Sequence, residues 1–212
     1  MLERGYEARQ TIYLSGEPDR HLYLLTEGVV EIYKLYGRHK KFTKALLQEG
    51  SVFSEPDLQV KGAHSDSAEA TTACRVATVG KAALEHHLLR DPKCSIALLL
   101  AYAQWAQWHE RAIERLIPRK MPARLAVTVL ELADRFGEPT KGGVAIGVYL
   151  TQQMLADLIA STRVSVSKEV ARFRRKGLLE TPSKGEIIVL DRRKLRDIVE
   201  GEGSKSLFSR SR

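Results

Sequence analysis

Residues 152–177, QQMLADLIASTRVSVSKEVARFRRKG, constrain the fold more than any other part of the chain. An apolar helical pattern ends at the small polar pair Ser161 and Thr162, and a second helical pattern follows, rich in cations near its end. Thr151 is a suitable N-cap for the first helix, and Gly177 is a suitable C′ residue for the second. The segment therefore predicts two short helices joined by a tight turn.

A hairpin and a further helix are expected after these two helices. The segment LLETPSKGEIIVLD predicts two strands around a PSKGE turn, and RRKLRDIVEG predicts a short last helix. Before them, PARLAVTVLELADRFG predicts an amphipathic helix and GEPTKGGVAIG a loop. Helix, turn, helix and β-hairpin is the order of a winged helix-turn-helix, which we expect in residues 118–212.

The first part of the chain has a different pattern, in which apolar and polar residues alternate. The stretches QTIYLSGEPDRHLYLLTEGVVEIYKL, KFTKALLQ and ATTACRVATVG predict short strands, separated by turn signals such as SGEPD and TEG. Near Lys81 the pattern changes, and KAALEHHLLRD predicts a helix. Residues 1–91 are thus expected to form an antiparallel barrel or β-roll that ends in this helix.

A long apolar helix is expected at residues 92–117, between Pro92 and Pro118. One apolar stripe approximates a heptad seam, made of Ile96, Leu99, Ala103, Ala106, Ile113 and Ile117. Other apolar residues cover a second face, and a helix that is apolar on two faces must bury both. We expect the seam to pack against a second subunit, the alternative being burial of both faces within one chain. The predicted fold class is α+β: a β-roll, a dimerisation helix and a winged helix-turn-helix.

The net charge of +8 lies entirely in the second half of the chain. Residues 1–117 hold 15 Lys and Arg against 15 Asp and Glu, whereas residues 118–212 hold 19 against 11. Such an asymmetry is expected if one domain binds a polyanion such as DNA, the alternative being a solvated basic face.

Targeting and metal signals are weak. No run approaches the roughly 20 apolar residues of a membrane span, and the start, MLERGYEARQ, does not resemble a signal peptide, so we expect a cytoplasmic protein without membrane partners. Cys74 and Cys94 are too few for a zinc or iron–sulfur site, and two buried thiols are expected. We expect no metal and no cofactor.

The second predicted helix carries the candidate DNA contacts. Residues near the start of a recognition helix reach base edges in the major groove, and here they are Thr162, Arg163, Val164, Ser167 and Lys168. An arginine can form a bidentate pair with guanine O6 and N7, whereas a valine can only meet a thymine methyl group. Candidate phosphate contacts are Arg172, Arg174, Arg175, Lys176 and Lys184. A helical hairpin with an exposed basic face is the alternative interpretation.

The turn between the two helices departs from the usual motif. Ala160 stands where helix-turn-helix turns favour glycine, and a left-handed alanine there would cost about 1 kcal/mol.

On these patterns the chain resembles the CRP/FNR family of bacterial transcription regulators. The resemblance rests on YLSGEPDRHLYLLTEGVVEIYK, PARLAVTVLELADRFG and LTQQMLADLIASTRVSVSKEV, and it extends over nearly the whole chain. It implies a homodimer that binds a palindromic promoter site, with Arg163 on a guanine. Val164 is similar to the nitrogen-control branch, which implies a half-site closer to TGT or GTA than to TGTGA. Activators of this family also contact RNA polymerase, and here the loop PTKGGVAIG has a suitable position.

The same resemblance indicates a vestigial effector pocket. Cyclic-nucleotide pockets of the family use a Gly-Glu pair and an Arg-Ser/Thr pair, with polar residues from the long helix. In this chain the corresponding residues are Ser54, Glu55, His64 and Ser65, with Trp105, His109 and Glu110 on the helix. The phosphate loses its bidentate cation, and Glu110 would repel it, so we expect no response to cyclic AMP.

Two other effector classes of the family also lack their partners in this chain. The oxygen-sensing branch needs an N-terminal cysteine cluster, and the 2-oxoglutarate branch uses an arginine where Trp105 aligns. Haem would need axial ligands, for which His64, Cys74, His86, His87 and Cys94 are available. We favour a regulator that works without an effector, the alternative being one gated by haem or an unidentified small molecule.

Three function classes follow from these patterns. A dimeric, sequence-specific transcription regulator is favoured by Arg163 beside Val164, and the resemblance implies an activator that contacts RNA polymerase. A cupin-like enzyme would need converging histidines, and no HxH pair is present, so we expect no enzyme. A DNA-packaging protein would bind with an affinity that depends on salt and hardly on sequence.

Overall fold

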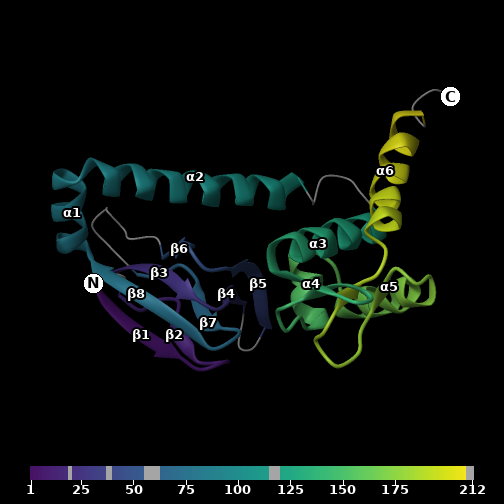
Figure 1. Ribbon diagram of the computed structural model, residues 1–212, viewed down its shortest axis with the longest axis horizontal. Coiled ribbons are helices and arrows are strands. Elements are labelled where there is room, and N and C mark those ends of the chain that lie inside the picture. The colour runs from purple at the N-terminus through teal and green to yellow at the C-terminus, as the bar shows by residue number, and fades with distance from the viewer. Residues whose placement is uncertain (19–20, 37–39, 55–62, 115–119, 209–212) are drawn as a thin grey trace. The chain divides into compact units, whose positions relative to one another are not determined.

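The computed structural model describes residues 1–18, 21–36, 40–54, 63–114 and 120–208. The chain divides into two compact units, Met1–Glu110 and Arg111–Arg212 (Figure 1). Within the described residues, no helix combines the length and the apolar character that a membrane crossing requires.

The first unit is a β-roll followed by helices. One antiparallel sheet has the order β1-β8-β3-β6 and the other has the order β2-β7-β4-β5. The strands are β1 (Leu2–Tyr6), β2 (Thr11–Tyr13), β3 (His21–Glu27), β4 (Val30–Tyr36), β5 (Lys40–Leu47), β6 (Val52–Phe53), β7 (Ser67–Ala70) and β8 (Cys74–Gly80). The helices are α1 (Lys81–Arg90) and α2 (Pro92–Glu114), whose last residues fall in the second unit.

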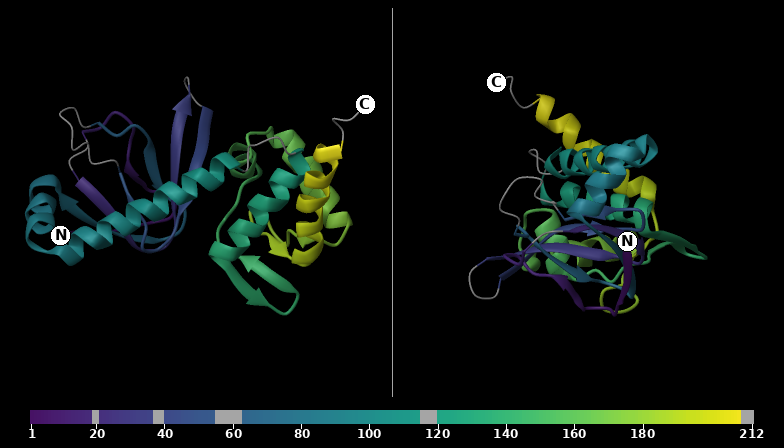
Figure 2. Two further views of the ribbon diagram at one scale, coloured as in Figure 1. Left: turned by 90° about the horizontal axis from the view of Figure 1, so that it is seen from above. Right: turned by 90° about the vertical axis from the view of Figure 1, so that its left-hand side faces the viewer.

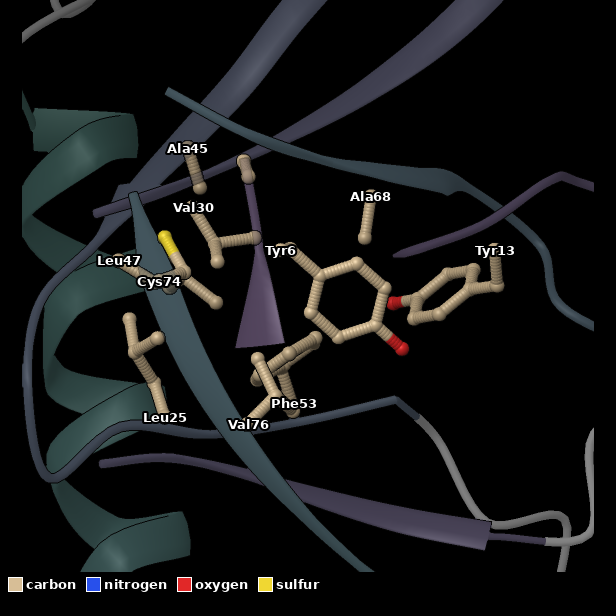
Figure 3. Close-up of a cluster of buried hydrophobic side chains, with 11 residues drawn as sticks. Tyr6, Tyr13, Leu25, Val30, Ala45, Leu47, Phe53, Ala68, Cys74 and Val76 are labelled. Carbon is tan, nitrogen blue, oxygen red and sulfur yellow. The ribbon is translucent and has the colours of Figure 1, made fainter. Parts of the chain in front are cut away.

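The core of the roll lies between the two sheets (Figure 3). Alternate residues of each strand face inward, so that β3 and β8 contribute Leu25 and Val76 while β4 and β7 contribute Val30 and Ala68. The other members of the cluster are Tyr6, Tyr13, Ala45, Leu47, Phe53, Ala70 and Cys74. Core residues two positions apart, such as Ala45 and Leu47 or Cys74 and Val76, explain why a sequence pattern of period two predicts these strands.

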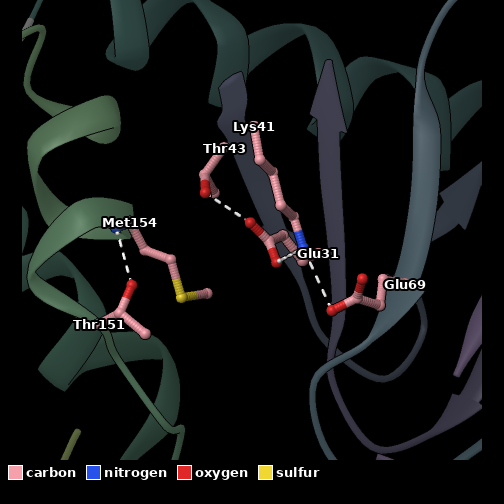
Figure 4. A network of polar contacts seen from close by, with 6 residues as sticks. All are labelled: Glu31, Lys41, Thr43, Glu69, Thr151 and Met154. Atoms are coloured by element: carbon pink, nitrogen blue, oxygen red, sulfur yellow. Dashed lines mark hydrogen bonds and ion pairs between the residues drawn. The ribbon is translucent and has the colours of Figure 1, made fainter. Parts of the chain in front are cut away.

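A charged network lies on the sheet that contains β4, β5 and β7 (Figure 4). The strand register puts Glu31 directly opposite Glu69, and Lys41 Nζ lies 2.8 Å from the first carboxylate and 3.1 Å from the second. Thr43 donates a 2.5 Å hydrogen bond to the buried Glu31. Burial acts to lower the pKa of Lys41, but the hydrogen bonds and charge attraction of the two glutamates outweigh it and raise this pKa. The lysine thus offsets the repulsion between two facing carboxylates.

The second unit is the winged helix-turn-helix. Its helices are α3 (Met121–Phe136), α4 (Gln152–Leu158), α5 (Arg163–Arg175) and α6 (Arg192–Phe208). One sheet has the order β11-β12-β10-β9, with β9 (Gly137–Thr140), β10 (Gly143–Ile146), β11 (Leu179–Glu180) and β12 (Ile188–Val189). The α+β class, the β-roll and the winged helix-turn-helix predicted from the sequence are confirmed.

Three sequence predictions in this unit and the roll are corrected. Residues 137–147 are not a loop, because β9 and β10 form a hairpin, seen in Figure 2, and β10 also pairs with β12. ATTACRVATVG is not one strand, because the chain turns at Thr71–Ala73, where Thr71 N–H donates to the carbonyl of Val29. The last helix continues to Phe208, since glycine weakens a helix by only about 1 kcal/mol and does not by itself end it.

Gly28 provides a stability test of the roll. Its φ is 91°, and an added Cβ would lie 2.3 Å from the carbonyl oxygen of Ala73 and 2.8 Å from Sγ of Cys74. Gly16 has a φ of 89° with open space around it, so it is a matched control. We expect Gly16→Ala to lower the free energy of unfolding by about 1–2 kcal/mol through backbone strain, and Gly28→Ala to lower it by about 1–3 kcal/mol more through overlap. Urea unfolding followed by circular dichroism measures both, and equal losses would contradict the packing at Gly28.

Candidate nucleic-acid interface

The first helix of the motif, α4, is capped and packed as its sequence indicates. The Thr151 hydroxyl accepts a 3.0 Å hydrogen bond from the Met154 amide (Figure 4), which confirms the predicted N-cap. Leu155, Ala156 and Ile159 are buried, as expected for the face that braces the second helix. The small side chain of Ala156 lets the two helices cross closely.

The turn contains the strained alanine that the sequence predicts. Ala160 has a φ of 48°, in the left-handed region. Two features stabilise this conformation. The amide of Ser161 donates to the carbonyl of Ala156 at 2.8 Å, and Arg124 Nε on α3 donates to the carbonyl of Ile159 at 3.0 Å. The contact with Arg124 was not foreseen from the sequence, because it joins residues 35 positions apart.

The second helix, α5, starts at Arg163 and is held by an N-cap and by buried residues on its inner face. The Thr162 hydroxyl accepts from the Ser165 amide at 3.2 Å and so caps the helix. Val166 and Val170 are buried as predicted, and Phe173 is fully buried with them. Phe173 was missed in the sequence, although its spacing of seven residues from Val166 would have indicated it. Gly177, with a φ of 65°, follows the C-cap Lys176, as expected of a C′ residue.

The candidate base-contacting residues lie in the first part of α5. Thr162, Arg163, Val164 and Lys168 are exposed and Ser167 is half-buried. Val164 is 63% exposed. An isolated valine this exposed contributes nothing to the core, so its place on the surface leaves it available for a partner.

The candidate phosphate contacts fall into two groups. Arg174, Arg175, Lys176 and Lys184 are exposed. Arg172 differs, because its guanidinium lies 2.7 Å from the carboxylate of Glu169, which is 7% exposed. Arg172 Nε is also buried and has no hydrogen-bond partner among the described residues. The charge of Arg172 is therefore partly neutralised by Glu169, whereas the other four cations are exposed to solvent.

A groove of about 680 Å³ lies beside these side chains. Its lining combines α5, the start of α4 and the wing turn, the latter being the residues between β11 and β12. Polar and charged lining residues include Arg163, Gln152, Gln153, Thr181, Ser183, Lys184 and Glu186. The sequence pattern does not indicate the two glutamines as site residues, because they look like ordinary exposed positions at the start of a helix.

The candidate effector residues of the roll are arranged differently from a polar pocket. His64 is 6% exposed, and its ring is stacked on Tyr13 with 3.7 Å between ring centroids and 8° between planes. Tyr23 and Phe53 complete this aromatic group, with 5.4 Å between their centroids. Ser54 has a φ of 74°, so a serine occupies a backbone conformation that favours glycine.

The remaining effector candidates are scattered or lie outside the described residues. Ser65 and Glu110 are exposed. Glu55 lies outside the described residues, as do the side chains of Trp105 and His109 on α2 and the residues Ile117 and Pro118. Among the candidates whose side chains the structure describes, His64 is the one with recorded ring contacts, to Tyr13 and Tyr23.

The proposed haem and thiol residues do not converge either. His86 and His87 are exposed on α1 with 5.8 Å between their rings. Cys74 is buried, which raises the pKa of its thiol, whereas Cys94 is half-buried, so the prediction of two buried thiols is wrong for Cys94. Among the described residues, no three His, Cys, Asp or Glu side chains are grouped as metal ligands would be.

Comparison with known proteins gives consistent results. Residues 3–91 match the family model of the cyclic nucleotide-binding domain, and residues 123–198 match that of the Crp-like helix-turn-helix domain. The chain is 31% identical over 182 residues to the global nitrogen regulator of Nostoc sp., covering 84% of this chain and 81% of that one. It is 33% identical over 180 residues to the transcriptional regulator LdrP of Thermus thermophilus, covering 84% and 87%.

The fold is also similar to a solved structure. The crystal structure of a CRP-family transcriptional regulator from Thermus thermophilus superimposes with a TM-score of 0.81 and 28% identity, covering 93% of this chain and 96% of that one. Sequence and fold thus agree over both units of the chain.

The ion pair of Arg172 predicts a difference between two neighbouring arginines. Arg172→Ala leaves the buried Glu169 carboxylate without its partner, so we expect the free energy of unfolding to fall by about 1–2 kcal/mol. Arg174→Ala removes an exposed side chain and should change it by less than about 0.5 kcal/mol. Thermal unfolding measures both values. Adding Glu169→Gln to Arg172→Ala should recover part of the lost free energy of unfolding. Equal losses for Arg172→Ala and Arg174→Ala would contradict a stabilising ion pair between Arg172 and Glu169.

Proposed function

Because the chain belongs to the CRP/FNR family of transcription regulators, we propose that it binds a palindromic promoter site as a homodimer and activates transcription there. Within this family it is a DNA-binding transcription regulator and not an enzyme. The finer proposals concern sequence readout, dimerisation, the polymerase contact and the effector.

Sequence readout is the proposal that the geometry supports best. The observation that carries it is the exposure of Arg163 and Val164 at the start of a helix whose opposite face is buried and capped. In a major groove, Arg163 would pair with guanine O6 and N7, and Val164 would meet a thymine methyl group. The absence of an acidic residue at position 164 favours a half-site of TGT or GTA type over TGTGA.

The same arrangement supports separate roles for the other surface residues. Thr162, Ser167 and Lys168 would contact bases or the adjacent backbone. Arg174, Arg175, Lys176 and Lys184 would contact phosphates, with a smaller contribution from the ion-paired Arg172. The two recognition helices of a dimer would then lie about 34 Å apart, one turn of DNA.

Dimerisation through α2 is supported by the exposure of its seam. Ile96, Leu99 and Ile113 are 58%, 68% and 65% exposed, and Ala103 and Ala106 are exposed between them. Large apolar side chains repeated at heptad spacing need a covering surface, which the same helix of a second subunit provides. Glu110 falls in the same register and would contribute charge rather than apolar area.

Activation would use the β9–β10 hairpin, by analogy with activators of the family that contact RNA polymerase through exposed loops. Residues 138–142 are exposed, and they include Lys141 at the turn. A rigid hairpin supports such a contact better than the loop expected from the sequence, since less conformational entropy is lost on binding.

An effector-independent roll is supported by the aromatic group at His64. The position at which the family holds its phosphate-binding arginine carries a histidine whose ring is stacked inside the roll. Without the bidentate cation, a cyclic phosphate has no matched partner there. A regulator gated by haem or a small molecule and a non-specific DNA-packaging protein are alternative outcomes of the experiment below.

Selection of bound DNA from a random library, with protein purified without ligand, tests this function. We expect enrichment of a two-fold palindrome at roughly physiological salt. Arg163→Ala should weaken binding to that site by about 1–3 kcal/mol and relax one base of each half-site. Arg174→Ala should weaken selected and random DNA alike and lower the slope of affinity against salt by about one per subunit.

Each alternative gives a different result in the same experiment. Enrichment only after a small molecule or haem is supplied would establish a gated regulator and overturn effector independence. Binding with no enrichment under any condition would indicate a packaging protein. An equal effect of Arg163→Ala on random DNA would remove this residue from base readout.

Dimerisation is tested separately by Ile113→Asp. A carboxylate in an apolar seam would be desolvated without a partner, so we expect monomers in sedimentation at micromolar concentration. Leu89→Asp is the control, because Leu89 is 88% exposed on α1 and lies outside the seam. A stable dimer of the Ile113 variant would show that the seam has another register or does not form the interface.

A further inference from the structure

Three consecutive residues, Tyr149 to Thr151, attach the wing turn to the first helix of the motif. The Leu150 amide donates a 2.8 Å hydrogen bond to the carbonyl of Gly185 in the wing turn. The Tyr149 ring lies against the same glycine, and Thr151 caps α4 directly afterwards. The wing turn and the helix-turn-helix are therefore connected through one short segment of chain.

The contact between Tyr149 and Gly185 leaves no room for a side chain. A Cβ added at Gly185 would lie 2.2 Å from Cε2 and 2.3 Å from Cδ2 of the tyrosine ring. Gly185 also has a φ of 85°, and the Glu186 amide donates to the carbonyl of Ser183 at 3.3 Å within the same turn. The ring thus rests on the backbone at the one residue of the turn that lacks a side chain.

This contact lies at the groove beside the recognition helix. Tyr149, Lys184 and Arg163 all line the groove, which is about 680 Å³ in volume. Lys184 is adjacent to Gly185 in the chain, so the ring that holds Gly185 also restricts where the lysine can lie. The wing cation Lys184 and the candidate base-contacting residue Arg163 thus line one groove.

We propose that Tyr149 is a positioning residue for DNA binding: its ring holds the wing turn at Gly185, so that Lys184 meets a backbone phosphate while Arg163 meets a base. This inference rests on the function proposed above and adds a residue that touches the wing rather than the DNA base. The apolar ring carries the effect, because the contact with Gly185 is made by ring carbons. Removing the ring frees the wing turn, and Lys184 then contacts the phosphate for a smaller fraction of the time.

The test compares Tyr149→Ala, Tyr149→Phe, Lys184→Ala and the double variant Tyr149→Ala/Lys184→Ala on the palindrome selected by the wild-type protein. We expect Tyr149→Ala to weaken binding about three- to tenfold and to lower the salt slope by about one per subunit. Lys184→Ala should do the same, and the double variant should be no weaker than either single variant. Tyr149→Phe should restore the affinity and the slope, and the base preference at the Arg163 contact should not change.

Gly185→Ala provides a second way to move the wing turn away from its position against the Tyr149 ring. It keeps the tyrosine and forces the wing turn away from the ring, so it should also lower the salt slope. Gly16→Ala is its control, because Gly16 lies in the other unit and has a φ of 89° with open space around it, so it reproduces the backbone strain without the overlap. Comparing Gly185→Ala with its control tests whether the wing turn must be held in place, even if Tyr149→Ala does not fold.

Two results would overturn the inference. Additive losses for Tyr149→Ala and Lys184→Ala would mean that the two residues act separately, and a full salt slope in Gly185→Ala would mean that the wing cation needs no support. Failure of the wild-type protein to select any sequence would instead contradict the proposed function, and it would be seen before any variant is made.

Discussion

The helix-turn-helix depends on the backbone at Ala160. A left-handed alanine costs about 1–2 kcal/mol relative to its preferred conformation, so the surroundings must hold it. Ile159 before the turn and Val166 after it are both buried, which fixes the chain on either side of Ala160. The Arg124 side chain also donates a hydrogen bond to the carbonyl of Ile159. Because this turn sets the direction of α5, the positions of all residues at the start of that helix follow from it. An arginine on α3 therefore supports the turn before the proposed recognition helix, although it is remote from the proposed base contacts in sequence.

Local signals explain which elements could be predicted from the sequence. Thr151 and Gly177 mark helix ends, the first through a hydrogen bond within three residues and the second through its own backbone conformation, and the structure confirms both. Elements defined by distant partners were missed. The strand β1 pairs with β8 about seventy residues later, and β10 is extended because it pairs with β12 about forty residues later. A short polar segment such as LERGY, which forms β1, carries no pattern that reveals such a partner.

The candidate site likewise has features that could be predicted from local sequence and features that depend on distant parts of the chain. Residue types and the exposed side of α5 could be predicted, because an amphipathic helix with Val166 and Val170 on its inner face leaves Arg163 and Val164 outside. Side-chain partners could not be predicted. The pairing of Arg172 with Glu169 depends on the burial of that glutamate, and the contact of Tyr149 with Gly185 depends on where the wing turn comes to lie. Charge counting alone treats Arg172 and Arg174 as equivalent, whereas burial distinguishes them.

The aromatic group of the roll bears on the effector by a similar argument. A ligand shifts the equilibrium between two states only by the difference in its affinity for them. The stacking of His64 on Tyr13 is worth about 0.5–1.5 kcal/mol, so a ligand that separated these two rings would lose it together with part of their burial. A cyclic phosphate could not replace that loss through a bidentate arginine, because none is present at this position. The stacked rings and the missing arginine are the physical reason for proposing that the roll acts as a scaffold.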